Sequence, residues 1–229
     1  MISNFNRSMA SLVCVTLVAA PDIKSYGDLR GKTLSVDVRT TGYAFVLYEM
    51  LARKGLTQND YRIETTGGMT QRRAALQQHR QVATLLSTPF NILARNEGFN
   101  QIATATDVIG PYQGNVAATR KSWARHNKAK LAAFVLAYVA AFDWLYDPKN
   151  REEAIRILLK NVPQMPPQLA AMTYGELLGP KAGFFRKGRS DVTGIRPVLA
   201  LRSRYATPHK VLTDPMKYYD ATYYRAAMH

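Results

Sequence analysis

Polar and apolar positions in the first half of the chain follow a rhythm of short strands separated by helices. Apolar and polar residues alternate over 34–38, and strand-like segments follow at 62–65, 82–86 and 101–104. Between these segments, apolar residues recur every three or four positions, as they do on one face of a helix. Strands separated by helices of roughly 10 to 15 residues are typical of a parallel sheet with crossover helices. We therefore expect an α/β fold.

The second half of the chain predicts mainly helices. Asn150 and Glu153 have the spacing of a capping box, and Pro166-Pro167 and Asp214-Pro215 each predict the start of a further helix. Between about residues 107 and 114 the alternation of strands and helices ends, which predicts a boundary there. One long apolar helical face, which ends before Asp147-Pro148, is formed by Leu131, Val135, Tyr138, Phe142 and Leu145.

The N-terminal segment has two interpretations. Met1 to Ala20 combines one basic residue, an apolar stretch and a small-residue Val18-Ala19-Ala20 sequence, as in a secretory signal. The alternative is a buried strand over residues 11–19 that leads into a turn at Pro21. In that case Cys14, the one cysteine of the chain, is a small core residue. The apolar run of residues 9–20 is too short to span a membrane as a helix, which needs about 20 residues.

Three predicted strand-to-helix turns share the same chemistry. In a parallel sheet all three turns lie at the carboxyl edge, where open α/β folds bind ligands. Glycine lets the backbone approach a ligand, hydroxyl groups donate hydrogen bonds, and helix N-termini present positive potential. The competing interpretation is simple helix capping, because Ser, Thr and Gly begin helices in many proteins. The candidate ligand-binding residues in these turns are Thr40, Thr41, Gly42 and Tyr43, then Gly67, Gly68 and Met69, and finally Ser87, Thr88 and Phe90.

Composition and charge narrow the function classes. The 229 residues are 47% hydrophobic and 21% charged, which excludes a disordered chain or a collagen-like fibre. The formal charge is +15, and residues 111–229 hold 19 basic against 8 acidic side chains. Such an excess fits a nucleic-acid-binding surface or a solvated basic face beside anionic lipids or partners. No RNA-recognition, zinc-finger or helix-turn-helix pattern accompanies the charge, which favours the solvated face.

The usual catalytic and cofactor signatures are missing from the sequence. It has no nucleophile elbow, no His-Glu-x-x-His motif, no phosphate-binding loop and no dinucleotide-binding glycine pattern. The four histidines are scattered without ligand spacing, and one cysteine cannot form a thiolate zinc site. We therefore expect no catalytic residues, no metal and no cofactor.

Several segments, taken in order, resemble a known family. Residues 20–37, Gly67-Gly68 before the Gln71–Leu76 helix, Ser87–Phe90 and residues 107–114 are similar to solute-binding proteins of nitrate/sulfonate/taurine ABC transporters. These are the SsuA-like proteins, related to the NMT1/THI5-like group. Residues 143–148 and the Tyr218-Tyr219-Asp220 segment also fit, so the resemblance extends from about residue 17 to the C-terminus.

The resemblance implies a periplasmic binding protein-like (type II) fold with two α/β lobes and a ligand between them. Residues 1–30 would be an N-terminal segment with a crossing strand, 31–105 one lobe, and 106–229 a crossing strand and the helical remainder of the other lobe. Tyr112 joins the candidate site residues by this resemblance. The implied function is capture of a small anionic or polar organic solute by hinge closure, followed by delivery to an ABC-transporter permease from the periplasm.

One departure from the family pattern is at the N-terminus. Family members begin with a signal peptide and about two strand–helix units of the first lobe, whereas this sequence has only residues 1–17 there. We therefore expect an incomplete first lobe and a homo-oligomer formed through an uncovered sheet edge. Two other functions remain: a lyase- or decarboxylase-like enzyme on the same scaffold, and a non-catalytic interaction domain.

Overall fold

The computed structural model describes residues 5–6, 10–11, 15–180 and 183–228, and the chain divides into two compact units. The sheet unit consists of Cys14–Tyr112 and Pro197–Leu212, and the helical unit consists of Met1–Val13, Gln113–Arg196 and Thr213–His229. Helix α9 (Val192–Tyr205) contributes to both units. The lobe boundaries expected at residues 30 and 105 stay a prediction, because compact units of this kind need not coincide with lobes.

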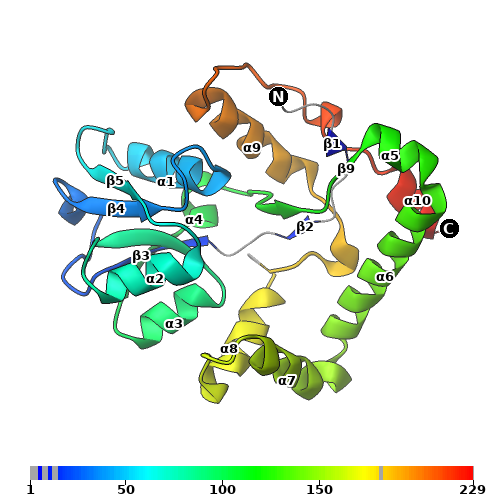
Figure 1. Ribbon diagram of the computed structural model, residues 1–229, viewed down its shortest axis with the longest axis horizontal. Helices are drawn as coiled ribbons and strands as arrows, with labels where there is room; N and C mark the ends of the chain where they lie inside the picture. Colours follow the sequence, from blue (N-terminus) through cyan, green and yellow to red (C-terminus); the bar gives the residue numbers. More distant parts are fainter. Residues whose placement is uncertain (1–4, 7–9, 12–14, 181–182, 229) are drawn as a thin grey trace. The chain divides into compact units, whose positions relative to one another are not determined.

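The sheet unit is built on a five-stranded sheet with the order β5-β4-β6-β3-β7 (Figure 1). Strand β4 is parallel to β5 and β6, whereas β3 is antiparallel to both β6 and β7. The four strands predicted from the pattern therefore run in one direction, and β3 is an antiparallel insertion between β6 and β7 that the pattern did not indicate. The strands are β3 (Val15–Ala19), β4 (Thr33–Val36), β5 (Arg62–Thr65), β6 (Ala83–Ser87) and β7 (Asn100–Thr104).

The N-terminal segment was interpreted either as a secretory signal or as a buried strand, and strand β3 decides this for its own five residues. All five of its residues are buried, and it pairs with a neighbour on each side. The strand interpretation is thus confirmed for Val15–Ala19, while Cys14 lies outside the described residues.

Helices cover both faces of the sheet. The chain passes from β4 outward to β5 and then back across β4 to β6. Because crossovers between parallel strands are right-handed, these opposite steps place α1 and α2 on opposite faces. Helix α3 packs beside α2, and α4 packs beside α1 (Figure 1). The helices of this unit are α1 (Gly42–Arg53), α2 (Met69–Gln77), α3 (Phe90–Asn96) and α4 (Ala105–Ile109), with a 3-10 turn η1 (Gly27–Leu29).

Because helices lie on both sides, the polar positions of β4 are buried as well as the apolar ones. Ser35 has no exposed surface, and its hydroxyl accepts a hydrogen bond from Gln81 Nε2 at 3.0 Å. The Ser35 carbonyl accepts another from Thr84 Oγ1 at 2.9 Å. Both bonds satisfy polar groups that would otherwise be costly to bury.

A buried carboxylate fixes the C-terminal half of α9 to α1. Glu49, which is 6% exposed, accepts hydrogen bonds from Arg53 Nε at 2.8 Å, Arg204 Nη1 at 3.0 Å and the Tyr205 hydroxyl at 3.0 Å. Burial by itself raises the pKa of Glu49, but the hydrogen bonds from Arg53 and Tyr205 and the charges of Arg204 and Arg53 lower it overall.

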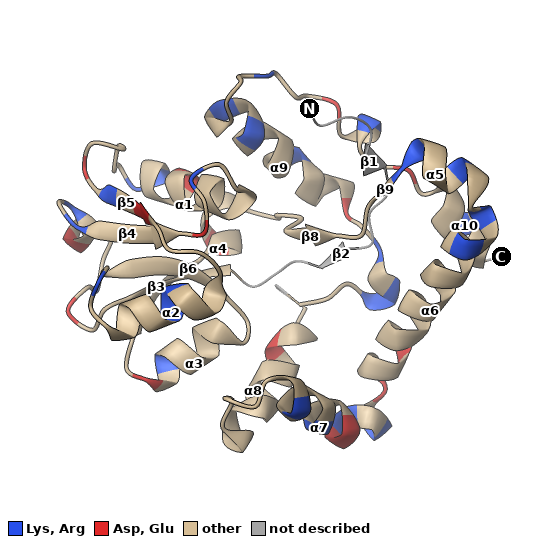
Figure 2. Cartoon of the chain, viewed as in Figure 1, with Lys and Arg blue, Asp and Glu red and all other residues tan. Residues whose placement is uncertain are grey.

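The helical unit contains two short antiparallel pairs and a set of helices. Strand β1 (Phe5–Asn6) pairs with β9 (Thr119–Arg120), and β2 (Ala10–Ser11) pairs with β8 (Asn115–Val116). The helices are α5 (Lys121–His126), α6 (Lys128–Tyr146), α7 (Arg151–Asn161), α8 (Pro167–Leu177) and α10 (Thr222–Met228), with 3-10 turns η2 (Pro148–Asn150), η3 (Arg186–Gly188) and η4 (Pro215–Lys217). Part of the basic excess of the second half lies on α5, α10 and the segment that precedes α9 (Figure 2).

One predicted helix cap and one predicted helix start are corrected. Asn150 is the N-cap residue of α7, but its side chain makes no cap hydrogen bond and instead donates to the Trp144 carbonyl at 2.9 Å. The capping box was therefore wrong. Asp214-Pro215 begins only the turn η4, and the tyrosine-rich helix α10 starts later, at Thr222.

Helix α6 is the 19-residue helix predicted from its apolar face. Leu131 and Val135 of that face form a small core with Val139 and Ala124. The helix is long and apolar enough to cross a membrane by length and composition alone, a test that core helices of soluble proteins also pass. Two further side chains of the helix, Phe134 and Leu136, are half exposed.

Candidate functional site

The three predicted turns begin helices at one edge of the sheet unit. Strands β4, β5 and β6 run in the same direction, so their carboxyl ends lead into α1, α2 and α3 at a common edge. We call this edge, with the three turns and Tyr112, the rim. Whether the eleven candidate residues contact a ligand stays a prediction, but the structure shows how they are placed.

The first turn is held by a helix cap. The Thr41 hydroxyl accepts a hydrogen bond from the Ala44 backbone N–H at 3.2 Å and donates one to Asp37 Oδ1 at 2.6 Å. Thr41 therefore performs the capping role that competed with ligand binding in the sequence interpretation. Gly42 is the first residue of α1, and Thr40 is exposed.

The second turn leaves the start of α2 without a side-chain cap. Gly67 has φ of +94°, a conformation that favours glycine, and Gly68 is the N-cap residue. Since Gly68 has no side chain, it cannot satisfy the first N–H groups of α2. Those groups are the ones that bind anions at helix N-termini.

A buried arginine lies directly behind this turn. Arg72 is 2% exposed, and it donates through Nη1 to the Leu85 carbonyl at 2.8 Å and through Nη2 to Met69 Sδ at 3.0 Å. Its buried Nε has no hydrogen-bond partner. Among residues 15–180 and 183–228, no carboxylate forms an ion pair with Arg72. The guanidinium is therefore a buried positive charge beside the N-terminus of α2 that is only partly compensated.

Two acidic side chains act on the pKa of Arg72. Burial lowers the pKa of the Arg72 guanidinium, while Asp37 and Tyr43 raise it. Asp37 and Tyr43 flank the start of α1, so Arg72 couples the first turn to the second. An arginine remains charged under ordinary conditions even when it is buried.

The third turn joins the second through the core. Ser87 is the last residue of β6, and Phe90 is the first of α3. Phe90 and Met69 are both partly buried and pack against one core cluster, which consists of Val18, Leu76, Leu86, Ala94 and Phe99. Thr88, which lies between Ser87 and Phe90 in the sequence, is partly buried. The third helix has only seven residues, so its N-terminus contributes less positive potential than α1 or α2.

Tyr112 meets the first turn. A β-carbon added to Gly42 would lie 3.1 Å from the Tyr112 hydroxyl, so the two residues are in close contact. Burial raises the pKa of Tyr112 to about 12, with the nearby Tyr43 acting in the same direction and Arg202 in the opposite one. The phenol therefore remains protonated at neutral pH and can donate a hydrogen bond.

The sequence interpretation did not select Arg72, Asp37 or Arg202 as site residues. A signal for Arg72 was present, because it stands three and four positions before Ala75 and Leu76, on the buried face of α2. Asp37 and Arg202 could not be selected from spacing, since their roles depend on contacts between distant segments. Among the described residues, no three His, Cys, Asp or Glu side chains gather as a metal site.

Solved structures of other proteins have the same fold as this chain. No curated protein sequence matches the chain at a significant level. Among solved structures, the periplasmic sulfonate-binding protein SsuA from Methylobacillus flagellatus KT is 17% identical with a TM-score of 0.70, over 98% of this chain and 68% of that one. The periplasmic nitrate-binding protein NrtA from Synechocystis PCC 6803 is 15% identical with a TM-score of 0.74, over 96% and 66%. These likenesses confirm the periplasmic binding protein-like fold.

A third solved structure of similar fold is an enzyme. The desulfurization enzyme DSZB is 12% identical with a TM-score of 0.60, over 98% of this chain and 78% of that one. The sequence profile of the NMT1-like family matches residues 16–159, which is more than half of the chain and includes the whole rim. The chain therefore belongs to the NMT1-like family, as its sequence motifs predicted.

Proposed function

We propose that the protein is a solute-binding protein that captures a small organic anion at the rim of the sheet unit. The observation that carries the proposal is Arg72, a buried guanidinium with an unpartnered Nε beside the uncapped start of α2. A buried charge that is only partly compensated is costly, and an anion at the rim reduces that cost.

The rim offers donors around the position of such an anion. The N-termini of α1 and α2 present backbone N–H groups and the positive end of each helix dipole. Tyr112 adds a protonated hydroxyl against Gly42. Helix N-termini and arginine together favour a sulfonate or carboxylate group, and Tyr43 and Phe90 provide aromatic surface for an organic or pyrimidine-like body.

The proposed role in transport is supported by solved proteins that share this fold. Two proteins that share the fold are named for binding sulfonate and nitrate in the periplasm. By analogy, the protein takes up its solute in the periplasm by hinge closure and presents it to the permease of an ABC transporter. Self-association through an uncovered sheet edge is part of the same proposal, and the edges of the described sheet are β5 and β7.

An enzyme on this scaffold is the second candidate, and the likeness to a desulfurization enzyme favours it. The rim supplies a carboxylate, Asp37, which accepts a hydrogen bond from the Thr41 hydroxyl, and a phenol, Tyr112. The hydroxyl that Asp37 contacts is already used as the cap of α1, because it accepts the Ala44 backbone N–H. Incubation of the protein with each ligand, followed by mass spectrometry of the solution, distinguishes the two: binding without product supports transport, and product formation supports catalysis.

A thermal-shift screen tests the proposal. The panel contains alkanesulfonates, nitrate, aromatic carboxylates and pyrimidines, with an alkylammonium salt of matched size as the charge control. A ligand that binds only the folded state stabilises it by about 2.7 kcal/mol at 100 times its Kd. We expect the melting temperature to rise with the concentration of at least one anion and to be unchanged by the ammonium salt. A flat response to the whole panel would contradict the proposal.

A further inference from the structure

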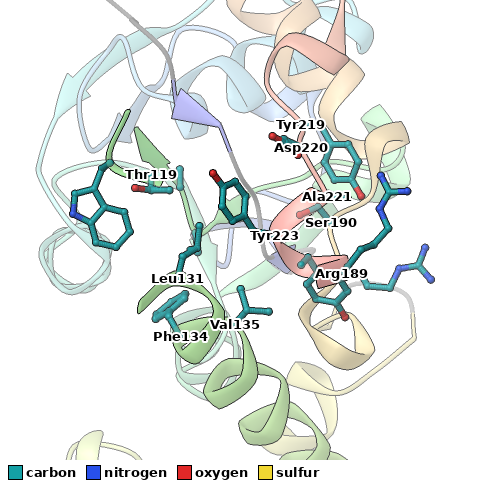
Figure 3. Close-up of a pocket in the computed structure, with 15 residues that line it drawn as sticks. Thr119, Leu131, Phe134, Val135, Arg189, Ser190, Tyr219, Asp220, Ala221 and Tyr223 are labelled. Atoms are coloured by element: carbon teal, nitrogen blue, oxygen red, sulfur yellow. The ribbon is translucent and has the colours of Figure 1, made fainter. Parts of the chain in front are cut away.

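The helical unit contains a cavity that is separate from the rim. Its volume is about 720 Å³, which lies within the range of small-molecule sites. Its walls come from segments far apart in the sequence: the residues around β9, helices α5, α6 and α10, the turn at Arg189-Ser190 and the residues just before α10. Figure 3 shows the labelled side chains of these segments around one hollow.

Apolar and aromatic groups form most of the wall. Helix α6 supplies Leu131, Phe134 and Val135, and Tyr223 faces them from α10 (Figure 3). Phe134 is 50% exposed and Trp123, on α5, is 44% exposed. Large aromatic side chains that remain exposed around a concave site mark a surface that gains free energy when a ligand covers it.

The charged residues of the wall are unbalanced. Arg189 and Arg225 are exposed guanidinium groups, whereas Asp220 is the one carboxylate among the lining residues, and its Oδ1 accepts the Thr222 backbone N–H at 2.8 Å. The Tyr224 hydroxyl is directed away to the Lys187 carbonyl at 2.9 Å. The cavity thus combines an apolar interior with a net positive edge.

We propose that this cavity is a second binding site, which takes an organic anion with an apolar tail. The tail lies against Phe134 and Leu131, and the anionic head pairs with Arg189 or Arg225. This site is independent of the rim, because every residue that lines it belongs to the helical unit. If no ligand binds at the rim, this proposal is unaffected. If no ligand binds in the cavity, the proposed function at the rim is unaffected.

Calorimetric titration with three ten-carbon probes tests the proposal. Decanoate, decanol and decyltrimethylammonium, all below their micelle-forming concentrations, share the tail and differ in charge. We expect decanoate to bind about tenfold or more tightly than decyltrimethylammonium, with decanol between them. Quenching of the Trp123 fluorescence, absent in a Trp123→Phe variant, places the bound probe in the cavity.

Two variants on the same helix give a matched comparison. Phe134→Glu places a carboxylate in the cavity wall, while Leu136→Glu places one on α6 outside the lining, and both parent side chains are 50% exposed. We expect Phe134→Glu to weaken decanoate binding about tenfold or more and Leu136→Glu to leave it unchanged. The double variant Arg189→Gln/Arg225→Gln removes the preference for decanoate over decyltrimethylammonium and retains binding of decanol.

Three results would overturn the proposal. The first is no binding of any probe, and the second is equal affinity for decanoate and decyltrimethylammonium. The third is a dimer that Phe134→Glu dissociates while decanoate does not bind, because the cavity would then be an interface between two copies. Circular dichroism of each variant confirms that a loss of binding is not a loss of fold.

Discussion

The hydroxyl oxygen of Tyr112 lies 3.1 Å from the point that a β-carbon on Gly42 would occupy. This contact joins the start of α1 to a residue 70 positions later in the sequence. Gly42→Ala forces the two groups apart by a few tenths of an ångström, and we expect a loss of about 1 kcal/mol in the free energy of unfolding.

Removal of the hydroxyl tests whether this contact causes the loss. In the double variant Gly42→Ala/Tyr112→Phe the added methyl group meets no oxygen, so the cost of Gly42→Ala should largely disappear. Urea denaturation of the wild type, both single variants and the double variant measures the coupling. Additive losses would mean that the two residues are not in contact in solution.

The cap of α1 predicts a second stability effect. Thr41→Ala removes the oxygen that accepts the Ala44 N–H, and we expect a loss of about 1 kcal/mol. Thr41→Ser should retain most of the stability, because serine caps equally well. Thr40→Ala is the matched control, since Thr40 is exposed one position earlier. An equal loss in Thr40→Ala would argue against a specific cap.

Replacement of Arg72 should weaken anion binding without unfolding the protein. Arg72→Met keeps an unbranched apolar side chain and removes the charge. We therefore expect the folded state to persist while affinity for an anionic ligand falls about tenfold or more. Arg73→Gln is the control, because Arg73 is on the same helix but pairs with Glu97. Unchanged anion affinity in Arg72→Met would remove the observation on which the proposed function rests.

Glu49 predicts a dependence of stability on pH. Its pKa is lower in the folded chain than in an unfolded one, so its contribution is present at neutral pH and is lost as the pH falls through the folded pKa. Glu49→Gln should therefore cost about 1–3 kcal/mol at pH 7 and much less near pH 3. Denaturation curves at several pH values test this, and a cost that does not change with pH would contradict it.

Self-association is tested by the mass in solution. Strands β5 and β7 form the edges of the described sheet, and unpaired edge strands favour pairing with another chain. We expect light scattering to give a multiple of the monomer mass that increases with protein concentration. A monomer at all concentrations would contradict this prediction.

The strands, helices and direction of the sheet could be predicted because each is a local pattern. The alternation in β4, the helix that follows Thr41 and the apolar face of α6 all depend on residues close in sequence. The insertion of β3 could not be predicted, because the pairing of Val15–Ala19 with β6 and β7 depends on residues 64 to 88 positions away. The side chain of Asn150 shows the same limit, since the Trp144 carbonyl competes successfully with the expected cap.

Only part of the candidate site could be predicted, because the rest depends on contacts between residues far apart in sequence. The turns were visible as Gly, Ser and Thr after each strand, whereas the charge that gives them a preference for anions comes from Arg72. Its importance depends on burial at 2% exposure and on its contacts with Leu85 and Met69, which only the folded chain reveals.

The most direct test is a nuclear magnetic resonance titration that follows the glycine amides of the ¹⁵N-labelled protein with an anion found in the screen. If a ligand binds at the rim, the amide signals of Gly42, Gly67 and Gly68 should shift in proportion to occupancy. The signals of Gly31, Gly55 and Gly98, which lie at the opposite edge of the sheet by topology, should remain in place. Shifts confined to that opposite edge, or no shifts at saturating anion, would contradict the account.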